Sequence, residues 1–196
     1  AVFRYFRQMN KTRLEAFSDG VIAIIITIMV LEMKIPHHAD FSSLKEIAPS
    51  FISYVLSFIF VGVYWGNHHH LLHTVKKISS GIMLSNLNLL FWLSLVPFAT
   101  GWMGENNFPP FAVACYAILL NICGISYTIM QNIIIKCVEP DSKFVSALKK
   151  QTRKGYVSVI SYGSAIPLAY VHPAISVTIF FIVAIYWLIP DKNIER

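Results

Sequence analysis

Long uncharged stretches separated by short charged ones dominate this chain of 196 residues. No Asp, Glu, Lys or Arg interrupts residues 47–75, 78–104 or 106–135. Each stretch can hold one helix of about 20 residues, the length that crosses the roughly 30 Å hydrocarbon core of a bilayer. The pattern therefore predicts membrane-spanning helices over residues 48–68, 81–103 and 109–135.

The uncharged stretch of residues 155–190 is too long to be a single span. As one helix it would measure about 54 Å, nearly twice the hydrocarbon thickness. Pro173 stands near its middle, and the residue before a proline is disfavoured in the helical conformation. We therefore expect a hairpin of two spans, over residues 156–171 and 174–190, with the break at residues 171–173.

The first apolar stretch is short, because only residues 20–31 separate Asp19 from Glu32. At 1.5 Å per residue it reaches about 18 Å, less than the hydrocarbon core. It could be a membrane span, the core of a signal peptide or a buried helix of a soluble domain. The sequence MKIPHHAD that follows offers no small-x-small cleavage site, which argues against a signal peptide.

The positions of the basic residues favour a span over residues 18–34. Lysine and arginine gather in the cytoplasmic loops of membrane proteins. If this first stretch crosses the membrane, every basic residue except Lys34 and Lys45 falls on one side. The sequence therefore predicts an all-α membrane protein, a single six-span domain over residues 1–196 with both termini in the cytoplasm.

The composition agrees with this interpretation, since 56% of the residues are hydrophobic and 13% are charged, against about 25% charged in a soluble domain. The net charge of +6 comes from the one-sided basic loops, which suit a surface facing anionic lipid and give no reason to invoke nucleic acid. The basic segment of residues 149–154 is expected to anchor the fifth span, with a regulatory lipid or protein contact as the alternative. Cys115, Cys123 and Cys137 have no paired spacing, so we expect free thiols.

Polar residues at the start of the first span suggest a helix in the protein interior, because such groups are costly against lipid. One face of this helix, about 100° wide, gathers residues at helical spacing: Arg13, Phe17, Gly20, Ile24, Thr27, Ile28 and Leu31. This stripe could line a conduit or could simply pack against other helices. Ser18 and Asp19 could cap the helix or hydrogen-bond to its neighbours.

Three segments resemble, in order, the RxxxFSD, WxxHH and Asn…PFxT motifs of the transmembrane protein 175 family of bacterial and lysosomal potassium channels. They are RLEAFSD at 13–19, WGNHH at 65–69 and NLLFWLSLVPFAT at 88–100. The resemblance is close over the first three spans. Over the last three it rests on their number and hydrophobicity.

The resemblance implies six helices per repeat and, because the chain holds one repeat, a homotetramer whose first helices line a central pore. It implies a constriction at Ile24, Thr27 and Leu31, with Ile28 as the next candidate if the helix is rotated slightly. Apolar rings would resist water, and the Thr27 hydroxyls would replace part of a cation's water shell.

The motif residues are implied to be structural, holding the first helix in place through contacts with the second and third helices. The expected network consists of Arg13, Phe17, Ser18, Asp19, Trp65, His68, His69 and Asn88.

The function implied by the resemblance is a potassium-selective or potassium-preferring channel of the bacterial plasma membrane, with a permeant monovalent cation and without cofactor or resident metal. A proton or non-selective cation leak is the first alternative. A secondary transporter is disfavoured, because spans two to six contain no charged residue at mid-depth. An intramembrane metal enzyme would rest on residues 68–73 alone, where His69 and His73 have ligand spacing. We therefore expect a channel rather than an enzyme.

Overall fold

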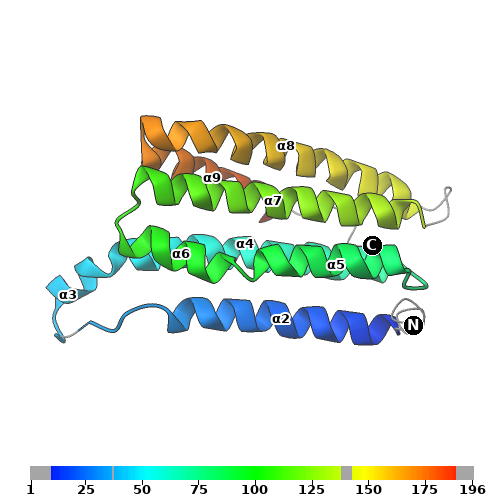
Figure 1. Ribbon diagram of the computed structural model, residues 1–196, viewed down its shortest axis with the longest axis horizontal. Helices are drawn as coiled ribbons and strands as arrows, with labels where there is room; N and C mark the ends of the chain where they lie inside the picture. Colours follow the sequence, from blue (N-terminus) through cyan, green and yellow to red (C-terminus); the bar gives the residue numbers. More distant parts are fainter. Residues whose placement is uncertain (1–9, 37, 138–142, 189–196) are drawn as a thin grey trace.

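The computed structural model describes residues 10–36, 38–137 and 143–188, and within these ranges the regular elements are helices (Figure 1). Their bounds are α2 (Lys11–Leu31), α3 (Phe41–Glu46), α4 (Ala48–His73), α5 (Ser80–Leu93), α6 (Val96–Glu105), α7 (Pro110–Ile135), α8 (Lys143–Val171) and α9 (Pro173–Leu188).

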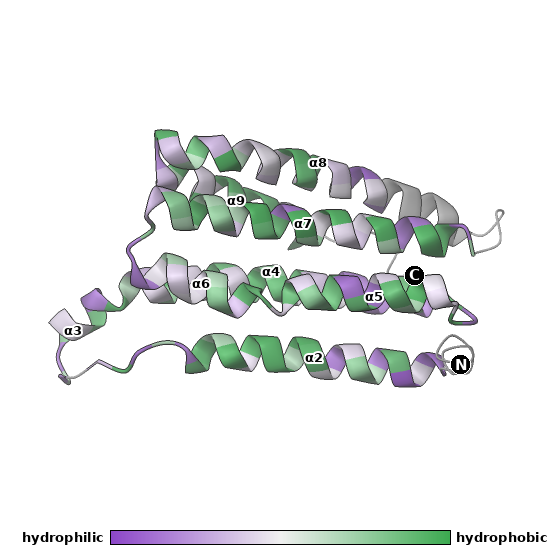
Figure 2. Cartoon of the chain, viewed as in Figure 1, coloured by the Kyte–Doolittle hydropathy of each residue, from purple (hydrophilic) through white to green (hydrophobic). Residues whose placement is uncertain are grey.

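The long helices lie side by side and run up and down between the two ends of an elongated bundle (Figure 1). α7 packs against α8 and α5, α4 packs against α6, and α9 packs against α8 and α4. α2 lies at one edge, in contact with α4, α5 and α6. Figure 2 shows apolar residues along the C-terminal half of α2, whereas its N-terminal half is more polar.

Within the described residues, four helical segments are long and apolar enough to cross a membrane: Lys11–Leu31, Ala48–His73, Ser80–Glu105 and Pro110–Ile135. These segments identify an integral membrane protein. α9 is apolar but shorter, with 16 residues. The last residues of the predicted sixth span, 189–190, lie outside the described residues.

The third predicted span, 81–103, is divided into α5 and α6 rather than forming one helix. Its regular hydrogen bonding is interrupted at Ser94 and Leu95, where the chain makes a tighter turn. Pro97 explains the break, because its ring carries no N–H and clashes with the carbonyl four residues earlier. Together α5 and α6 still cover residues 80–105, the length of one span.

The hairpin between α8 and α9 turns at His172, where the sequence predicts a break. The His172 Nδ1 accepts a hydrogen bond from the N–H of Ala174 at 3.3 Å, which satisfies one of the free amides at the start of α9. Further along α9, the buried hydroxyl of Ser176 donates to Ala165 O at 2.7 Å and ties the two helices together.

The connection from α2 to α4 contains the short helix α3 and two polar ties. Asp40 caps α3 by accepting hydrogen bonds from the N–H of Ser43 and the hydroxyl of Ser42, both at 2.8 Å. These bonds, the one from the Ser43 backbone first, hold the pKa of the Asp40 carboxyl below its ordinary value. Lys34 forms an ion pair with Glu105 at 2.8 Å and joins this connection to the end of α6.

α4 and α6 approach each other closely at Gly104, which has no side chain to keep them apart. A Cβ at this position would overlap the Ser53 hydroxyl and lie 2.7 Å from the Cα of Ser50. Small residues allow such backbone approach between membrane helices.

Replacing Gly104 by Ala should therefore destabilise the folded chain by about 1–3 kcal/mol, because the two helices must separate. Unfolding in mixed detergent micelles, followed by circular dichroism, measures the change. Gly101→Ala is the matched control on α6, because a Cβ there has no heavy atom within 4 Å. The control should be neutral or slightly stabilising, since Ala favours a helix over Gly by up to about 1 kcal/mol. Equal stability of the two variants would contradict close packing at Gly104.

Candidate functional site

α2 presents two distinct faces in the single chain. Its buried face consists of side chains three or four residues apart: Leu14, Ser18, Ile22, Ile25 and Met29. The opposite face is exposed and holds the stripe that the sequence analysis singled out: Arg13, Phe17, Gly20, Ile24, Thr27, Ile28 and Leu31. Ile24 is 58% exposed and Leu31 is 79% exposed. Exposed apolar side chains also occur on the other long helices, for example Phe58 on α4 and Ile160 on α8.

Thr27 lies on this exposed face, and its hydroxyl group already donates a hydrogen bond within α2. Its Oγ1 donates to Ile24 O at 2.9 Å, a bond within the same helix. A hydroxyl that donates its proton to its own helix keeps its lone pairs available for a partner outside the helix. The exposed side of the Thr27 oxygen can therefore act as an acceptor, which is the property that a cation ligand requires.

An open groove runs beside the exposed stripe, between α2 and the break that separates α5 from α6. Ile24 and Ile28 line one wall, and Ser94, Pro97 and Phe98 line the other. Phe98 is 69% exposed. The break in the third span thus lies directly beside the apolar part of α2.

A buried chain of hydrogen bonds joins α2 to α5 and α4. The Asn86 amide donates through Nδ2 to Ser18 Oγ at 3.0 Å, and Ser18 Oγ donates in turn to Leu14 O at 2.9 Å. The Oδ1 of Asn86 lies 2.6 Å from Nε2 of His68, so the neutral tautomer that carries its proton on Nε2 fits this contact. Asn86, Ser18 and His68 are all buried.

A second contact runs from α4 to α2 one residue further along. The indole N–H of Trp65 donates to the Asp19 carboxylate at 3.0 Å. His69 takes no part in a hydrogen bond of this network. Its ring stacks on Trp65 at a centroid separation of 6.1 Å and meets the ring of His73 edge-on at 4.6 Å.

The structure thus brings together Ser18, Asp19, Trp65 and His68, and sets apart other members of the predicted network. Arg13 and Phe17 lie on the exposed side of α2.

Asn88, which was predicted to face α2, bonds instead to Ser126 Oγ on α7 at 2.9 Å. The reason is geometric, because two residues along a helix differ by about 200° in direction.

Asn86 takes the place that was predicted for Asn88. A signal for it exists in the sequence, because Asn86 is in phase with the apolar positions Ile82, Leu89 and Leu93 at helical spacing. All three of these are fully buried in the structure. An asparagine on the apolar face of a membrane helix is the residue to expect in a buried polar contact.

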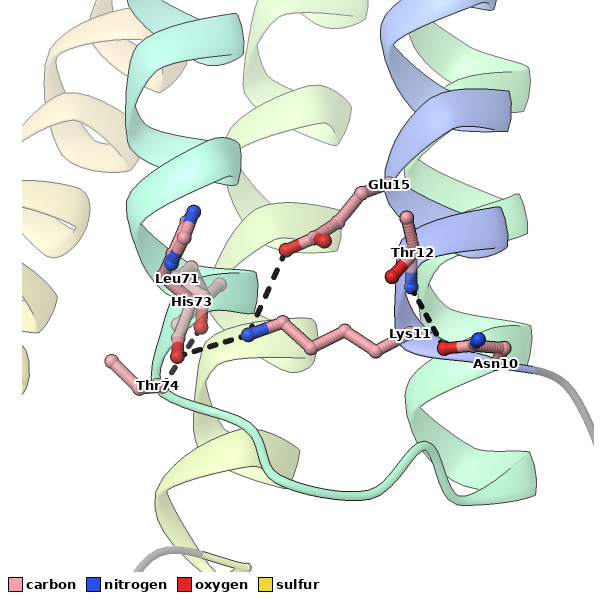
Figure 3. Close-up of polar contacts among 7 residues, drawn as sticks. All are labelled: Asn10, Lys11, Thr12, Glu15, Leu71, His73 and Thr74. Atoms are coloured by element: carbon pink, nitrogen blue, oxygen red, sulfur yellow. Dashed lines mark hydrogen bonds and ion pairs between the residues drawn. The ribbon is translucent and has the colours of Figure 1, made fainter.

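Lys11 makes a further link where α2 begins and α4 ends (Figure 3). Its Nζ donates to His73 O at 3.1 Å and lies 3.8 Å from Glu15 Oε1. A cation beside the last carbonyls of a helix satisfies acceptors that lack an intrahelical partner. The adjacent Asn10 caps α2 by accepting from the N–H of Thr12 at 3.2 Å.

Among the histidines of residues 68–73, His68 is already engaged by Asn86, whereas the rings of His69 and His73 lie in contact. The described part of the chain holds no group of three or more His, Cys, Asp or Glu side chains placed to bind a metal ion.

Comparison with known proteins gives similarity over nearly the whole chain. The family model for the endosomal/lysosomal potassium channel TMEM175 matches residues 13–97. A potassium channel of Chryseobacterium sp. is 50% identical over 188 residues, which cover 96% of this chain and 97% of that protein. The crystal structure of a lysosomal potassium-selective channel TMEM175 homolog from Chamaesiphon minutus superposes with a TM-score of 0.81 at 32% identity, over 91% of this chain and 96% of that one.

A more distant relative shares only part of the sequence. The human endosomal/lysosomal proton channel TMEM175 is 32% identical over 109 residues, which are 50% of this chain and 22% of that protein.

Replacing Asn86 by Ala should cost about 1–3 kcal/mol of stability, because it leaves the buried His68 N–H without an acceptor. Asn88→Ala is the matched control on the same helix. It removes one bond to Ser126 and should cost about 0.6 kcal/mol, the average for such bonds between membrane helices. Denaturant titration in mixed micelles compares the free energies of unfolding of the two variants. A larger loss for Asn88→Ala would show that Asn86 is not the anchor of α2.

Proposed function

Because the chain belongs to the TMEM175 family, we propose that it is a potassium channel in which α2 from several copies of the subunit lines the pore. The observation that carries this proposal is the exposed apolar stripe on α2, on a helix whose other face is fixed by buried hydrogen bonds. Its relatives of similar length are named as channels, so transport of ions rather than catalysis is its activity.

We propose a homotetramer as the conducting assembly. A stripe at the edge of the bundle becomes the lining of a pore only when copies of the subunit bring their α2 helices around one axis. The groove beside α2, with Phe98 exposed on its far wall, gives a neighbouring copy an apolar surface to cover. A heterologous contact between copies gives a closed ring when the rotation between neighbours closes.

The constriction would consist of apolar rings at Ile24 and Leu31 with Thr27 between them, and Ile28 beside them. Apolar rings destabilise water in a narrow pore and so impose an energetic barrier on hydrated ions. Each Thr27 hydroxyl donates its proton to Ile24 O of its own helix. In a tetramer the four Thr27 oxygens would therefore serve as acceptors for a cation that has lost part of its water shell. Potassium holds its water less strongly than sodium, so this partial loss of water costs potassium less and favours its passage.

The proposed topology has six spans, with both termini in the cytoplasm of a bacterial cell. The charges at one end of the bundle support this topology. At that end α2, α5 and α8 begin, and α4 and α7 end (Figure 1). We call this the basic end, because described basic residues gather there: Lys11, Arg13, Lys76, Lys77 and Lys136. Arg153 and Lys154 lie further along α8, ten and eleven residues after it begins. Lys34 and Lys45 lie at the opposite end. The basic residues within 1–9 and 189–196 lie outside the described residues.

Proton conduction is the second candidate, and the name of the human relative favours it. A ring of hydroxyls between apolar rings can hold a short file of water, along which protons move without a bare ion. Flux from liposomes under separate potassium, sodium and proton gradients distinguishes the two functions.

Replacing Ile24 or Leu31 by Asn should raise the potassium flux several-fold and lower the preference for potassium over sodium, because a polar ring removes the barrier to water. Ile160→Asn is the matched control, since Ile160 is 72% exposed on α8, away from the proposed pore. Flux from liposomes measures all three variants. Wild-type flux and selectivity in both α2 variants would refute the constriction.

Replacing Thr27 by Val should reduce the selectivity for potassium over sodium, because it removes the acceptor oxygen at nearly constant volume. Thr27→Ser keeps the hydroxyl and should keep the selectivity. Reversal potentials measured in planar bilayers under mixed potassium and sodium give the ratio for each variant. If Val and Ser behave alike, the Thr27 oxygen takes no part in selection.

A further inference from the structure

A small cavity lies away from α2, where α4, α7, α8 and α9 meet. Its volume is about 30 Å³. A cavity needs roughly 10–15 Å³ of such space to hold one water molecule. The space therefore suits a water molecule and is too small for a lipid chain or an organic ligand.

The side of the cavity toward the basic end is closed by amide groups that already have protein partners. Asn67 lines this side, and its Oδ1 accepts a hydrogen bond from Nε2 of the buried Gln151. The Asn67 Nδ2 donates to Val63 O at 2.8 Å, and the Asn67 carbonyl accepts from the Tyr127 hydroxyl at 3.2 Å. Asn67 is thus fully engaged within the protein.

Two other hydroxyls on the wall of the cavity have no such partner. Tyr64, on α4, and Tyr162, on α8, both line the cavity, and among the described residues neither side chain forms a hydrogen bond with protein. Tyr162 is 3% exposed. A buried hydroxyl without a hydrogen bond costs free energy, and a buried tyrosine normally has a partner.

The aromatic packing around both rings holds these hydroxyls where they are. The ring centre of Tyr64 lies 4.6 Å from that of Phe60 and 5.8 Å from that of Tyr127. The ring centre of Tyr162 lies 6.3 Å from that of Phe60 and 6.2 Å from that of Phe180. Neither ring can turn toward another partner without disturbing its neighbours.

Ser158 supplies a third polar atom, one turn before Tyr162 on α8, and it also lines the cavity. Its hydroxyl donates to Lys154 O at 3.0 Å and accepts from the Trp187 indole N–H at 2.7 Å. A hydroxyl oxygen has two lone pairs, so Ser158 can accept one more hydrogen bond.

The Tyr64 hydroxyl reaches this part of the cavity from α4. A Cβ at Gly124 on α7 would lie 3.8 Å from Tyr64 Oη and 3.2 Å from Val159 Cγ2 on α8. Val159 directly follows Ser158 in the chain. The Tyr64 oxygen therefore lies close to the junction of α7 with the part of α8 that carries Ser158.

We propose that this cavity is the binding site of one structural water molecule, held by Tyr64, Tyr162 and Ser158. The water accepts from the two tyrosine hydroxyls and donates to Ser158 Oγ, so each of the three groups gains the partner that the protein does not supply. Three hydrogen bonds are typical of a buried water. The water joins α4 to α8 and helps to dock the α8–α9 hairpin on the rest of the bundle. The proposal does not depend on ion conduction.

X-ray footprinting of the wild-type full chain in detergent tests for the water directly, because hydroxyl radicals formed from a bound water oxidise the side chains that touch it. Tyr162 should be oxidised several-fold faster than Tyr116. Tyr116 is the matched control, since it is fully buried and its hydroxyl lies 2.7 Å from Ser57 Oγ, within hydrogen-bond distance. Equally slow oxidation of the two tyrosines would overturn the proposal.

A density map that resolves ordered water locates the molecule. In the wild type, one water should lie within hydrogen-bond distance of the Tyr64, Tyr162 and Ser158 oxygens. It should be lost when Tyr64 and Tyr162 are both replaced by Phe, and kept in the control Tyr116→Phe. The same water in the double variant would overturn the proposed partners.

Xenon applied to wild-type crystals covers the case in which the double variant does not fold. Xenon enters dry apolar cavities, so it should stay out of one that holds a hydrogen-bonded water. A xenon atom between Tyr64 and Tyr162 in the wild type would overturn the proposal.

Discussion

The position of α2 depends on one requirement of the bilayer, which is that buried polar groups find partners within the protein. Ser18 and Asn86 meet this requirement together, and His68 completes the chain on α4. These bonds fix the rotation of α2 about its own axis. Once that rotation is fixed, the opposite face must carry the exposed stripe that includes Ile24 and Leu31, and every proposal about conduction follows from that face.

The four helical segments that are long and apolar enough to cross a membrane were predictable, because charge is excluded from the hydrocarbon and this signal depends on composition alone. The break between α5 and α6 was not predicted. A proline in a long apolar run is compatible with either a kink or a full interruption, and tertiary packing decides between them. Here Val96 and Pro97 are buried, so α6 begins as a separate helix packed against α4. The turn at His172 was easier to predict, since no bilayer accommodates a helix of the full length.

The candidate site was predictable in part. The stripe on α2 follows from helical spacing, whereas the anchoring residue on α5 was misassigned by two positions. Motif similarity pointed to Asn88, but the direction of each side chain around α5 gives the contact to Asn86. The cavity between α4 and α9 had no sequence signal, because its walls come from residues that are far apart in the chain and share no pattern.

The polar contacts of α2 with other helices are unevenly distributed along its length. In its first half, Lys11, Ser18 and Asp19 make such contacts. In its second half, among the described residues, the Thr100 hydroxyl makes a weak contact with Met29 Sδ at 4.0 Å. The first half of α2 is therefore held by directional bonds, and the second half by packing that tolerates small displacement. Leu31 lies about 18 Å beyond Asp19, so a tilt of about 5° would move it by roughly 1.5 Å while Asp19 stays in place. The end of α2 away from Asp19 is thus where the radius of an assembled pore would respond most strongly to a lateral force.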